Sequence, residues 1–583
     1  MKSYDIFIAG ALMASPIVAQ LPTYSGCPGG QGATLDPSHF RKQELYGRNA
    51  IPGGTVLNEP VQIALHPIKA NGAITAVDIY SVGRLGKVFY YNGAAKTVSD
   101  MGTIPTWAAR TGGMNDNGLM GLAIDPDFDR NKYMYFWYGA PVASAGAPRI
   151  IRLSRIATTA DHKLDLASEK ILIQIRGAAT DTWHSGGPMQ FDKHGDLWIQ
   201  VGNQSNDIND GSQYSNDSLT SDEWGPPNTA NMRGSTLRIH PDGSAKGYSI
   251  PAGNFGEYWA AEWDKQNKAA LAAEYRNPAK VLPEVYIKGE RSNYSIGVHP
   301  TKRWLAWGTV NYESAWDEFN VVDHPAFTGF PYFHANNVLL PTGNFAAKYG
   351  FTQVASAPRN MSALSTGVKD LPPAWPGAVN SLASVGVAGA VYGFDPSLDS
   401  PVKFPPHFNN TFIGFDFIPT ANNPMWLFVV DTTNFSVPQN KRIKVNDGLF
   451  AGIVYRRPLQ AVYGPDGALY INSYDGFYST GNPGVTRIDY IGPCKIAVTT
   501  KVAEVEQEFS IIFTPSRLSV WEAGRHEFGL FSMDGTRLVS KSGVRGAEYS
   551  LTELRANHNL GKGVHVVKVK TGKGLFVRNV SFL

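Results

Sequence analysis

The sequence contains little cysteine and little charge. Only two of its 583 residues are cysteine, which excludes a scaffold held by many disulfides and a zinc site built from four thiolates. Charged residues make up 17% of the chain, against about 25% in a typical soluble protein. Lys and Arg number 52 and Asp and Glu number 49, so the net charge is +3. That charge is too small for a chain of this length to indicate a nucleic-acid partner.

Motifs that would identify several other classes of enzyme are also absent. The chain has no Cys-x-x-Cys-His haem site, no Gly-x-Gly-x-x-Gly followed by a helix and no P-loop. It has no His-Glu-x-x-His zinc motif and no Gly-x-Ser-x-Gly nucleophile elbow. No apolar stretch reaches the roughly 20 residues of a membrane span. Because the sequence has no haem site, any electrons that the protein takes from a substrate must pass to an external acceptor.

Turn-forming and apolar residues are abundant instead. The chain holds 60 Gly and 38 Pro, a content that favours a turn-rich β protein over a helical one. Hydrophobic residues reach 43% and aromatic residues 12%, enough to bury a sizeable core. At about 150 residues per domain, the length predicts two to four domains, or one large β domain with additions. Helical periodicity is convincing only in short stretches, mainly between Trp259 and Arg276.

The first twenty residues resemble a secretory signal peptide. One Lys is followed by an apolar run from Ile6 to Ala14 and then by small residues up to Ala19. We therefore expect residues 1–20 to be a signal peptide and the mature protein to be secreted, periplasmic or at the cell surface. A buried first strand is the alternative.

The two cysteines lie at opposite ends of the long central region. Cys27 follows the expected signal peptide, and Cys494 lies near the end of that region. An exported protein can form disulfides, and a bridge over so long a loop would remove about 5 kcal/mol of denatured-chain entropy. Two unpaired buried thiols are the alternative.

Four segments of the central region share one pattern, in which an apolar strand is followed by a tight turn and an aromatic-rich strand. They are residues 121–136, 189–202, 296–308 and 461–474. Their turns contain Asp-Pro, His-Gly, His-Pro and Pro-Asp-Gly, which supply the fixed or positive φ that hairpins need. Repeated hairpins of this kind are typical of a β-propeller, which we expect over residues 21–495. Several unrelated sandwich domains are the alternative.

A different pattern begins near residue 496 and continues to the C-terminus. Short strands separated by turn residues predict a small β-sandwich over residues 496–583. The segment contains no set of residues suited to catalysis. It resembles the C-terminal modules that serve in sorting or surface attachment on exported enzymes of some cellulolytic and gliding bacteria. Attachment of the protein to the cell surface is therefore an expectation.

His184 is the residue that most suggests chemistry. It stands in the sequence Trp-His-Ser-Gly-Gly-Pro, where the Gly-Gly pair lets other groups approach the backbone closely. At the start of a propeller strand, an imidazole with a near-neutral pKa can act as a general base. A histidine that only packs in the core is the alternative.

Other segments, in a fixed order along the chain, point to a known family. They are residues 118–138, 228–244, 284–300 and 314–333, arranged around His184-Ser-Gly-Gly. This series resembles the soluble PQQ-dependent glucose and sorbosone dehydrogenases. The resemblance implies an all-β fold with a six-bladed propeller. It also implies bound pyrroloquinoline quinone (PQQ) and Ca²⁺, and oxidation of a small sugar at its anomeric carbon.

The resemblance also implies roles for individual residues. The family's catalytic base is the histidine before Gly-Gly, here His184, and Arg291 of the Gly-Glu-Arg-Ser segment matches the arginine that hydrogen-bonds the reacting quinone oxygen. Asn203 stands where the family has the aspartate that orients the histidine. Asp116, Asn117, Arg291 and Ser292 are the expected cofactor contacts. The Ca²⁺ ligands are expected to be the main-chain carbonyls of Tyr312 and Glu313.

The chain departs from the family at several of these places. Asn203 replaces an aspartate, Asp116 replaces a glutamine, and Gly393 stands where the family has a lysine. These substitutions leave a second hypothesis open, in which a cofactor-free propeller binds carbohydrate at the cell surface without catalysis. A Ca²⁺-dependent hydrolase resembling a lactonase is the third.

Overall fold

The structure is a computed structural model of the whole chain. It describes residues 21, 35–48, 50, 59–108, 116–142, 149–176, 184–204, 225–311, 317–340, 352–361, 367–380, 385–417, 425–445, 449, 457–474, 483–494, 511–513, 517–520, 525–532, 535–544, 547–558, 560, 563–571 and 574–582. The chain divides into two compact units, Met1–Val498 and Thr499–Leu583. The expected signal peptide (residues 1–20) and the expected boundary between residues 495 and 496 lie outside the described residues.

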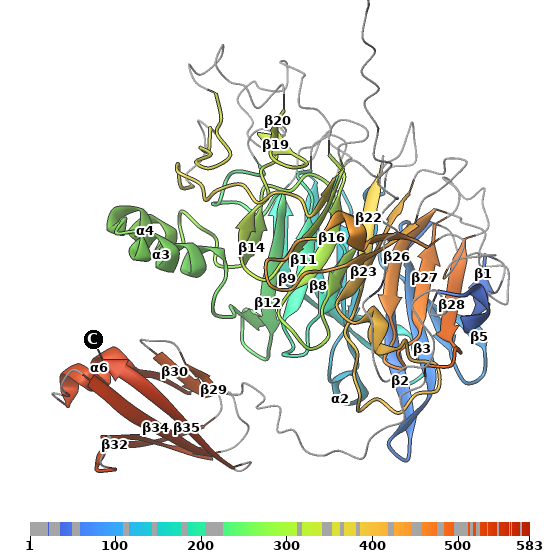
Figure 1. Cartoon of the computed structure of the whole chain (residues 1–583). Helices are drawn as coiled ribbons and strands as arrows, with labels where there is room; N and C mark the ends of the chain where they lie inside the picture. The colour runs from blue at the N-terminus through green and yellow to red at the C-terminus, as the bar shows by residue number, and fades with distance from the viewer. Residues whose placement is uncertain are drawn as a thin grey trace, which may run out of the picture. The chain divides into compact units, whose positions relative to one another are not determined.

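Within the described residues, the first unit contains six sheets of four or more strands (Figure 1). The first two are β2 (Pro60–Ala70), β3 (Ala73–Gly83), β4 (Lys87–Asn92), β5 (Thr97–Thr103); and β6 (Leu119–Ile124), β7 (Tyr133–Gly139), β8 (Ile150–Thr158), β9 (Leu164–Arg176). The third is β10 (Met189–Phe191), β11 (Leu197–Val201), β12 (Ser235–Pro241), β14 (Val285–Lys288) and β18 (Ala326–Phe327), with β13 (Tyr248–Ser249) beside β12. The fourth is β15 (Ile296–Val298), β16 (Leu305–Thr309), β17 (Glu318–Val322) and β21 (Val379–Asn380). The last two are β22 (Gly386–Tyr392), β23 (Thr411–Asp416), β24 (Met425–Val429), β25 (Arg442–Lys444); and β26 (Pro458–Tyr463), β27 (Leu469–Ser473), β28 (Gly484–Tyr490), β1 (Phe40–Gly47).

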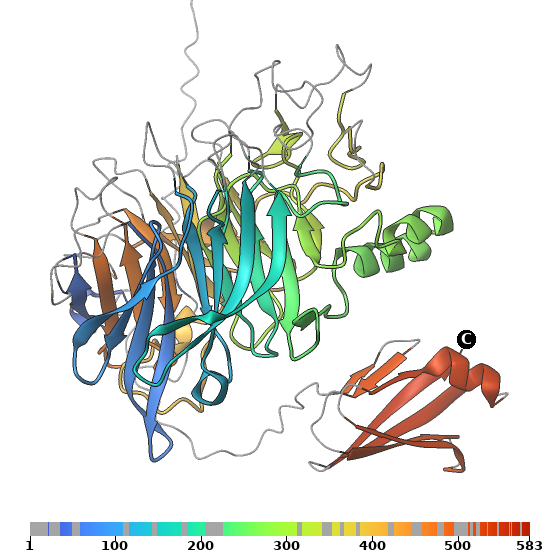
Figure 2. The ribbon, with the colours of Figure 1, turned by 180° about the vertical axis from the view of Figure 1, so that it is seen from behind.

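The few helices and short elements lie between these strands. They are η1 (Pro37–His39), α2 (Phe128–Asn131), α3 (Phe255–Lys265), α4 (Ala269–Arg276), the strand pair β19 (Phe333–His334) and β20 (Val338–Leu339), η3 (Pro406–Phe408) and η4 (Gln439–Lys441). Helices α3 and α4 form a hairpin between β13 and β14 (Figure 2). The all-β prediction is confirmed. None of the helices in the described part of the chain is long and apolar enough to cross a membrane.

The six sheets close into a ring. The first strand of each sheet contacts the first strand of the next, in the order β2, β6, β10, β15, β22 and β26, and β26 contacts β2 again. Each first strand is followed by an antiparallel partner, as the four repeated segments predicted. This is the arrangement of a β-propeller with six blades around one axis.

The N-terminal strand completes the last blade. β1 pairs antiparallel with β28, from Phe40 opposite Tyr490 to Gly47 opposite Gly484. The Arg41 guanidinium also bonds the buried carboxylate of Asp489 at 2.6 Å. The two ends of the propeller sequence are thereby joined within one sheet by a ladder of hydrogen bonds, which closes the ring.

The sheets are buried on both faces because each packs between two neighbours. β7 shows the consequence, since Phe136 and Trp137 are fully buried on opposite sides of one strand. Sheets buried in this way need continuous apolar and aromatic runs rather than simple alternation. The aromatic-rich second strands of the repeats therefore form the packing between blades.

Glutamine side chains join neighbouring first strands near the axis. Gln460 of β26 accepts a hydrogen bond from the Ile63 backbone N–H at 2.7 Å and donates one to the Ile63 carbonyl at 3.2 Å. Gln62 of β2 accepts from the Leu122 N–H at 3.0 Å and donates to the Met189 carbonyl at 2.7 Å. These amides satisfy backbone groups that no strand partner reaches.

The second unit consists of two sheets and a helix. Its elements are β29 (Ile511–Phe513), β30 (Arg517–Val520), β33 (Ala547–Ser550); β32 (Arg537–Val544), β31 (Arg525–Phe531), β34 (Gly563–Thr571), β35 (Gly574–Phe582); and α6 (Leu551–Asn557). Leu518 and Val520 of the first sheet share one core with Phe528 and Leu530 of the second. Two sheets on one core form the small sandwich that the sequence predicted.

Cys494 is buried and forms a disulfide. Cys27 lies outside the described residues.

Replacing Gln460 by Leu is expected to destabilise the propeller at its seam. The change leaves the N–H and carbonyl of Ile63 without partners, so we expect the free energy of unfolding to fall by about 2 kcal/mol. Chemical denaturation measures it. Gln439→Leu is the matched control because Gln439 is exposed in η4. Equal effects of the two changes would contradict a role of Gln460 in closing the ring.

Candidate functional site

The predicted site residues gather at one end of the propeller. Asp116 precedes β6 and His184 precedes β10, so both lie where first strands begin. Asn203 follows β11, which is antiparallel to β10 and returns to the same end. Arg291 follows β14, whose neighbour β12 runs antiparallel to it. We call this end of the propeller the His184 rim.

The backbone at His184 is in the left-handed region. Its φ is +51°, a conformation that costs a non-glycine residue free energy and needs support from its surroundings. Gly186 and Gly187 follow with φ of +71° and +131°. A Cβ on Gly187 would lie 2.6 Å from the Cβ of Met120, so the Gly-Gly pair lets this loop pack tightly against β6.

The ring of His184 is oriented by Asn203. The His184 Nδ1 lies 2.7 Å from the Asn203 Oδ1, and both residues are buried. Because an amide oxygen only accepts, Nδ1 carries the hydrogen, and Nε2 is the basic nitrogen of the ring. The Asn203 N–H in turn donates to the Arg291 carbonyl at 2.8 Å. The structure therefore brings three predicted site residues together.

Asp116 holds the backbone of His184. Its Oδ1 accepts the His184 N–H at 2.6 Å, and its Oδ2 accepts the Tyr294 hydroxyl at 3.0 Å. Burial raises the pKa of Asp116 to about 7, although these hydrogen bonds and the nearby Arg291 charge favour the ionised form.

Arg291 lies near two buried carboxyl groups. Its Nη1 donates to the carbonyls of Val310 and Asn311, at 3.3 Å each. Its charge also lowers the pKa of both Asp116 and Asp317, opposing the larger effect of burial. Arg291 is therefore a buried cation held at the His184 rim.

Further buried ionisable groups lie at the same rim. Burial raises the pKa of Glu290 to about 7 and that of Glu318 to about 8, and it lowers the pKa of Lys288 well below its usual value. The Lys288 Nζ lies within hydrogen-bond distance of three carbonyl oxygens and of the Ser235 hydroxyl. Electrostatic interactions between such groups are strongest where water is excluded and the local dielectric constant is low.

Two other arginines lie at the same rim. Arg84 follows β3, makes a buried ion pair with Glu59 at 2.6 Å and donates to the Asn117 carbonyl. Arg457 precedes β26, with its guanidinium over the ring of Phe417.

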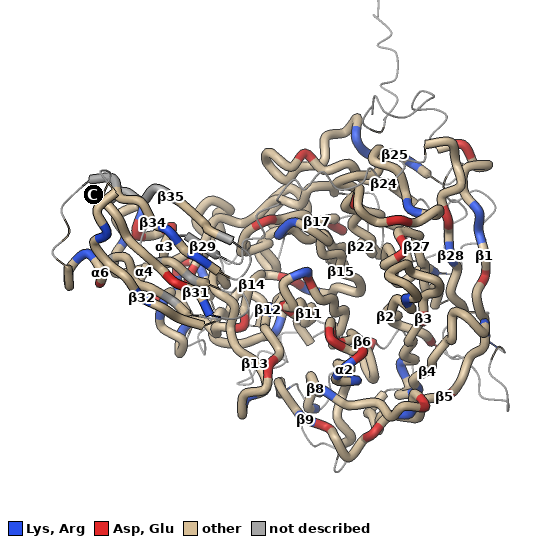
Figure 3. Tube along the Cα trace, turned by 90° about the horizontal axis from the view of Figure 1, so that it is seen from below, with Lys and Arg blue, Asp and Glu red and all other residues tan. Residues whose placement is uncertain are grey.

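Figure 3 shows Lys and Arg interspersed with Asp and Glu along the propeller trace, without a long stripe of one sign.

The structure describes some of the remaining predicted residues and not others. Ser292 is buried and its carbonyl accepts the Val310 N–H at 2.8 Å, beside Arg291. Tyr312 and Glu313, the predicted Ca²⁺ ligands, lie outside the described residues. Among the residues that are described, no three His, Cys, Asp or Glu side chains form a group suited to a metal ion.

The sequence reasoning did not identify Tyr294 or Asp317 as functional. Tyr294 lies 178 residues from Asp116, so no local motif joins them. Asp317 accepts the N–H groups of Asn311 and Gly386, at 2.9 and 2.6 Å. In the sequence, the feature that could have marked Asp317 is its place as the first residue of the segment Asp-Glu-Phe-Asn, residues 317–320.

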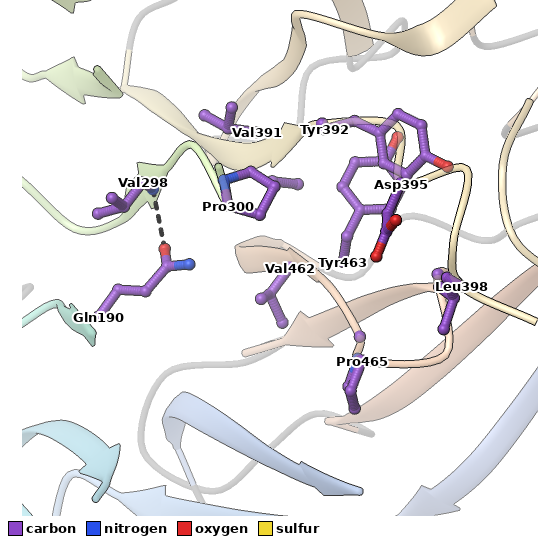
Figure 4. Close-up of a pocket in the computed structure, with 14 residues that line it drawn as sticks. Gln190, Val298, Pro300, Val391, Tyr392, Asp395, Leu398, Val462, Tyr463 and Pro465 are labelled. Atoms are coloured by element: carbon purple, nitrogen blue, oxygen red, sulfur yellow. Dashed lines mark hydrogen bonds between the residues drawn. The ribbon is translucent and has the colours of Figure 1, made fainter. Parts of the chain in front are cut away.

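A separate pocket lies at the opposite rim, where first strands end. It has a volume of about 200 Å³, and Figure 4 shows Gln190, Val298, Tyr392 and Tyr463 around it. Gln190 accepts the Val298 N–H at 3.0 Å. Gly393, the position expected to carry a lysine in the family, lines this pocket. Because Gly393 is far along β22 from the His184 rim, its lack of a side chain says nothing about that site.

Comparison with known proteins agrees with the predicted resemblance. Residues 80–254, which include His184, Asn203 and Asp116, match the family model described as Glucose / Sorbosone dehydrogenase. The soluble aldose sugar dehydrogenase of Escherichia coli, in its apo form, is 16% identical with a TM-score of 0.48, covering 77% of this chain and 99% of that chain. The PQQ-bound aldose sugar dehydrogenase of Streptomyces coelicolor is 15% identical with a TM-score of 0.45, covering 78% and 99%. The family match confirms the resemblance over residues 80–254, a segment that includes part of the His184 rim.

Glu318 makes the stability of the propeller depend on pH. Its raised pKa means that the folded protein keeps a proton that the unfolded chain releases, so stability falls as pH rises from about 5 towards 8. Glu318→Gln should remove this loss. We expect the difference in unfolding free energy between wild type and variant to change by about 2–3 kcal/mol across that interval.

Denaturation of both proteins at several pH values measures this difference. The amide oxygen of the variant can still accept from Asn311. Asn320 now donates to Glu318 through Nδ2, so its amide must turn over to present Oδ1, which has no partner among the described residues, to the new NH₂. Glu257→Gln on exposed α3 is the control. A Glu318→Gln curve parallel to that of wild type would contradict the buried-carboxyl account.

Proposed function

We propose that the protein is an exported oxidoreductase that oxidises an aldose or a related sugar at its anomeric carbon, using PQQ and Ca²⁺. The observation that supports this most is the His184–Asn203 pair, which lies inside the segment that matches the family model. With its hydrogen on Nδ1, the unprotonated ring leaves Nε2 as the nitrogen that accepts a proton. That is the state a general base needs.

The proposed reaction divides between His184 and Arg291. Oxidation of an aldose at C1 removes the hydroxyl proton and a hydride and leaves a lactone. Nε2 of His184 accepts the proton, and Asn203 holds the ring in the required tautomer throughout. Arg291 is buried at the same rim, where a fixed cation stabilises an oxygen that gains negative charge.

The described residues of the His184 rim fit an anionic cofactor. Arg291 and Arg457 supply cations from two different blades, and arginine forms strong hydrogen bonds with carboxylates. Gln204, next to Asn203, buries an amide whose oxygen and nitrogen both lack hydrogen-bond partners, and a polar ligand would satisfy them. Asn117 and Ser292, which flank these groups, are the further proposed contacts. When bound, PQQ supplies the acceptor for the hydride.

The Ca²⁺ ion is proposed at the loop that contains Tyr312 and Glu313. The support lies in the residues on either side of it, since the Asn311 N–H donates to Asp317 at 2.9 Å and closes the base of the loop. Main-chain carbonyls suit Ca²⁺, which prefers oxygen ligands. The carboxylate of Asp317 already accepts two backbone hydrogen bonds, so it positions this loop rather than coordinating the ion.

Export and surface attachment are proposed from the two ends of the chain. The N-terminal twenty residues have the pattern of a signal peptide. The C-terminal sandwich has a core of its own, as suits a separate sorting or attachment module. An external electron acceptor is proposed because the chain has no haem motif.

The proposed function is tested by reconstitution. The protein is loaded with PQQ and Ca²⁺, and dye reduction is followed with a panel of aldoses. We expect PQQ binding by calorimetry and sugar-dependent reduction that His184→Ala lowers at least 100-fold. Absence of both PQQ binding and dye reduction would exclude the proposal. Sugar binding by the cofactor-free protein, unchanged in His184→Ala, would support a carbohydrate-binding propeller instead.

Asn203→Asp is expected to strengthen the base. A carboxylate stabilises the imidazolium that forms on proton transfer, whereas the amide only orients the ring. We expect kcat of dye reduction at neutral pH to rise about tenfold. Asn203→Ala, which removes the bond to Nδ1, should lower it. An unchanged kcat in Asn203→Asp would mean that His184 does not gain a proton in the rate-limiting step.

A further inference from the structure

Three segments hold His184, of which two flank strands of its own sheet and one precedes the first strand of the neighbouring blade. The loop before β6 provides Asp116, the loop after β11 provides Asn203, and the loop after β14 provides Tyr294 through Asp116. The His184 carbonyl also accepts the Gln204 N–H at 3.2 Å. The residue is therefore fixed at its N–H, its carbonyl and its ring.

The bond at the His184 N–H is the one that opposes backbone strain. In the left-handed conformation the N–H points where no strand partner meets it, and Asp116 Oδ1 accepts it at 2.6 Å. The Asp116 carbonyl accepts the next N–H, that of Ser185, at 3.3 Å. One residue thus holds two consecutive N–H groups of the loop.

Tyr294 fixes the carboxyl group in turn. Its hydroxyl donates to Asp116 Oδ2 at 3.0 Å. Asp116 is buried, so its two oxygens have little contact with water. Both oxygens accept protein hydrogen bonds, an arrangement that suits a structural anchor better than a contact with a negatively charged cofactor.

We propose that Asp116, supported by Tyr294, is a positioning residue that holds the strained backbone of His184 so that its imidazole stays in place for proton transfer. This assigns Asp116 a role other than the cofactor contact expected from its place in the sequence. The proposal rests on the proposed function of His184 as the base.

The anchor depends on the ionisation of Asp116. A carboxylate accepts from both His184 and Tyr294, whereas a protonated carboxyl must turn one oxygen into a donor. Among the described residues, the charged or titratable groups that face it are His184, Tyr294 and Arg291, with the Arg84–Glu59 pair beyond Asn117. Burial places the pKa of Asp116 at about 7. Activity should therefore decline as the pH falls through this value.

Three variants separate the parts of the anchor. Asp116→Ala removes both bonds, Asp116→Asn keeps an acceptor for the His184 N–H but no ionisable group, and Tyr294→Phe removes only the support of Oδ2. Tyr90→Phe is the matched control, because Tyr90 is a tyrosine of β4 whose hydroxyl donates to the buried Asp78 at 2.7 Å.

Two readouts are measured on the full chain. The first is hydrogen–deuterium exchange of the peptide that contains His184, in the cofactor-free protein. The second is kcat of dye reduction against pH after loading with PQQ and Ca²⁺, together with the calorimetric Kd for PQQ.

We expect Asp116→Ala to speed exchange at His184 and to lower kcat about 10- to 100-fold while the Kd for PQQ changes less than about threefold. Asp116→Asn should restore most of the kcat and shift the acid limb of the profile to lower pH. Tyr294→Phe should show a smaller loss of kcat, and Tyr90→Phe none.

The outcomes distinguish this proposal from the proposed function. Unchanged exchange and unchanged kcat in Asp116→Ala would overturn the anchor, as would a large change in the Kd for PQQ with kcat intact. Faster exchange in a protein that reduces no dye with any aldose would support the anchor and overturn the proposed function.

Discussion

Closure of the ring of sheets is the constraint on which the rest of the structure depends. β1 pairs with β28 in the last blade. Gln460 joins β26, the first strand of the last blade, to Ile63 of β2 in the first blade. The loops before β10, after β11 and after β14 belong to one sheet, and the loop before β6 belongs to the blade that packs against it, so the packing of neighbouring blades brings them to one rim. The residues of those loops lie up to 178 positions apart in the sequence, as Asp116 and Tyr294 do. The site is therefore formed where two neighbouring blades meet and not by either blade alone.

The rim concentrates ionisable groups in a place with little water. Asp116, Glu290 and Glu318 all have a raised pKa because burial disfavours their charged forms. Arg291 lies among them as a buried cation. A low dielectric makes every such interaction stronger, so a proton on one group depends on the others. The raised pKa values are the reason why activity and stability are expected to depend on pH. Burial of these groups also lowers the stability of the fold.

Part of this could be predicted from the sequence. The repeated hairpins predicted the propeller because inner strand, turn and aromatic strand are consecutive in the chain. His184 was predicted because the Gly-Gly pair that its loop needs is adjacent to it. The contact of Asp116 with His184 was not predicted, since it joins two loops through the ring. Gly393 could not be placed either, because its motif does not show at which end of a strand it lies.

The central claim is that the His184 rim removes hydride and proton from a sugar. The most direct measurement is a single turnover without oxygen, in which protein loaded with PQQ and Ca²⁺ is mixed with an aldose carrying either hydrogen or deuterium at C1. A sugar oxidoreductase of this kind will show reduction of the cofactor by absorbance, slower with the deuterated sugar. Bound PQQ that no aldose reduces would contradict the claim.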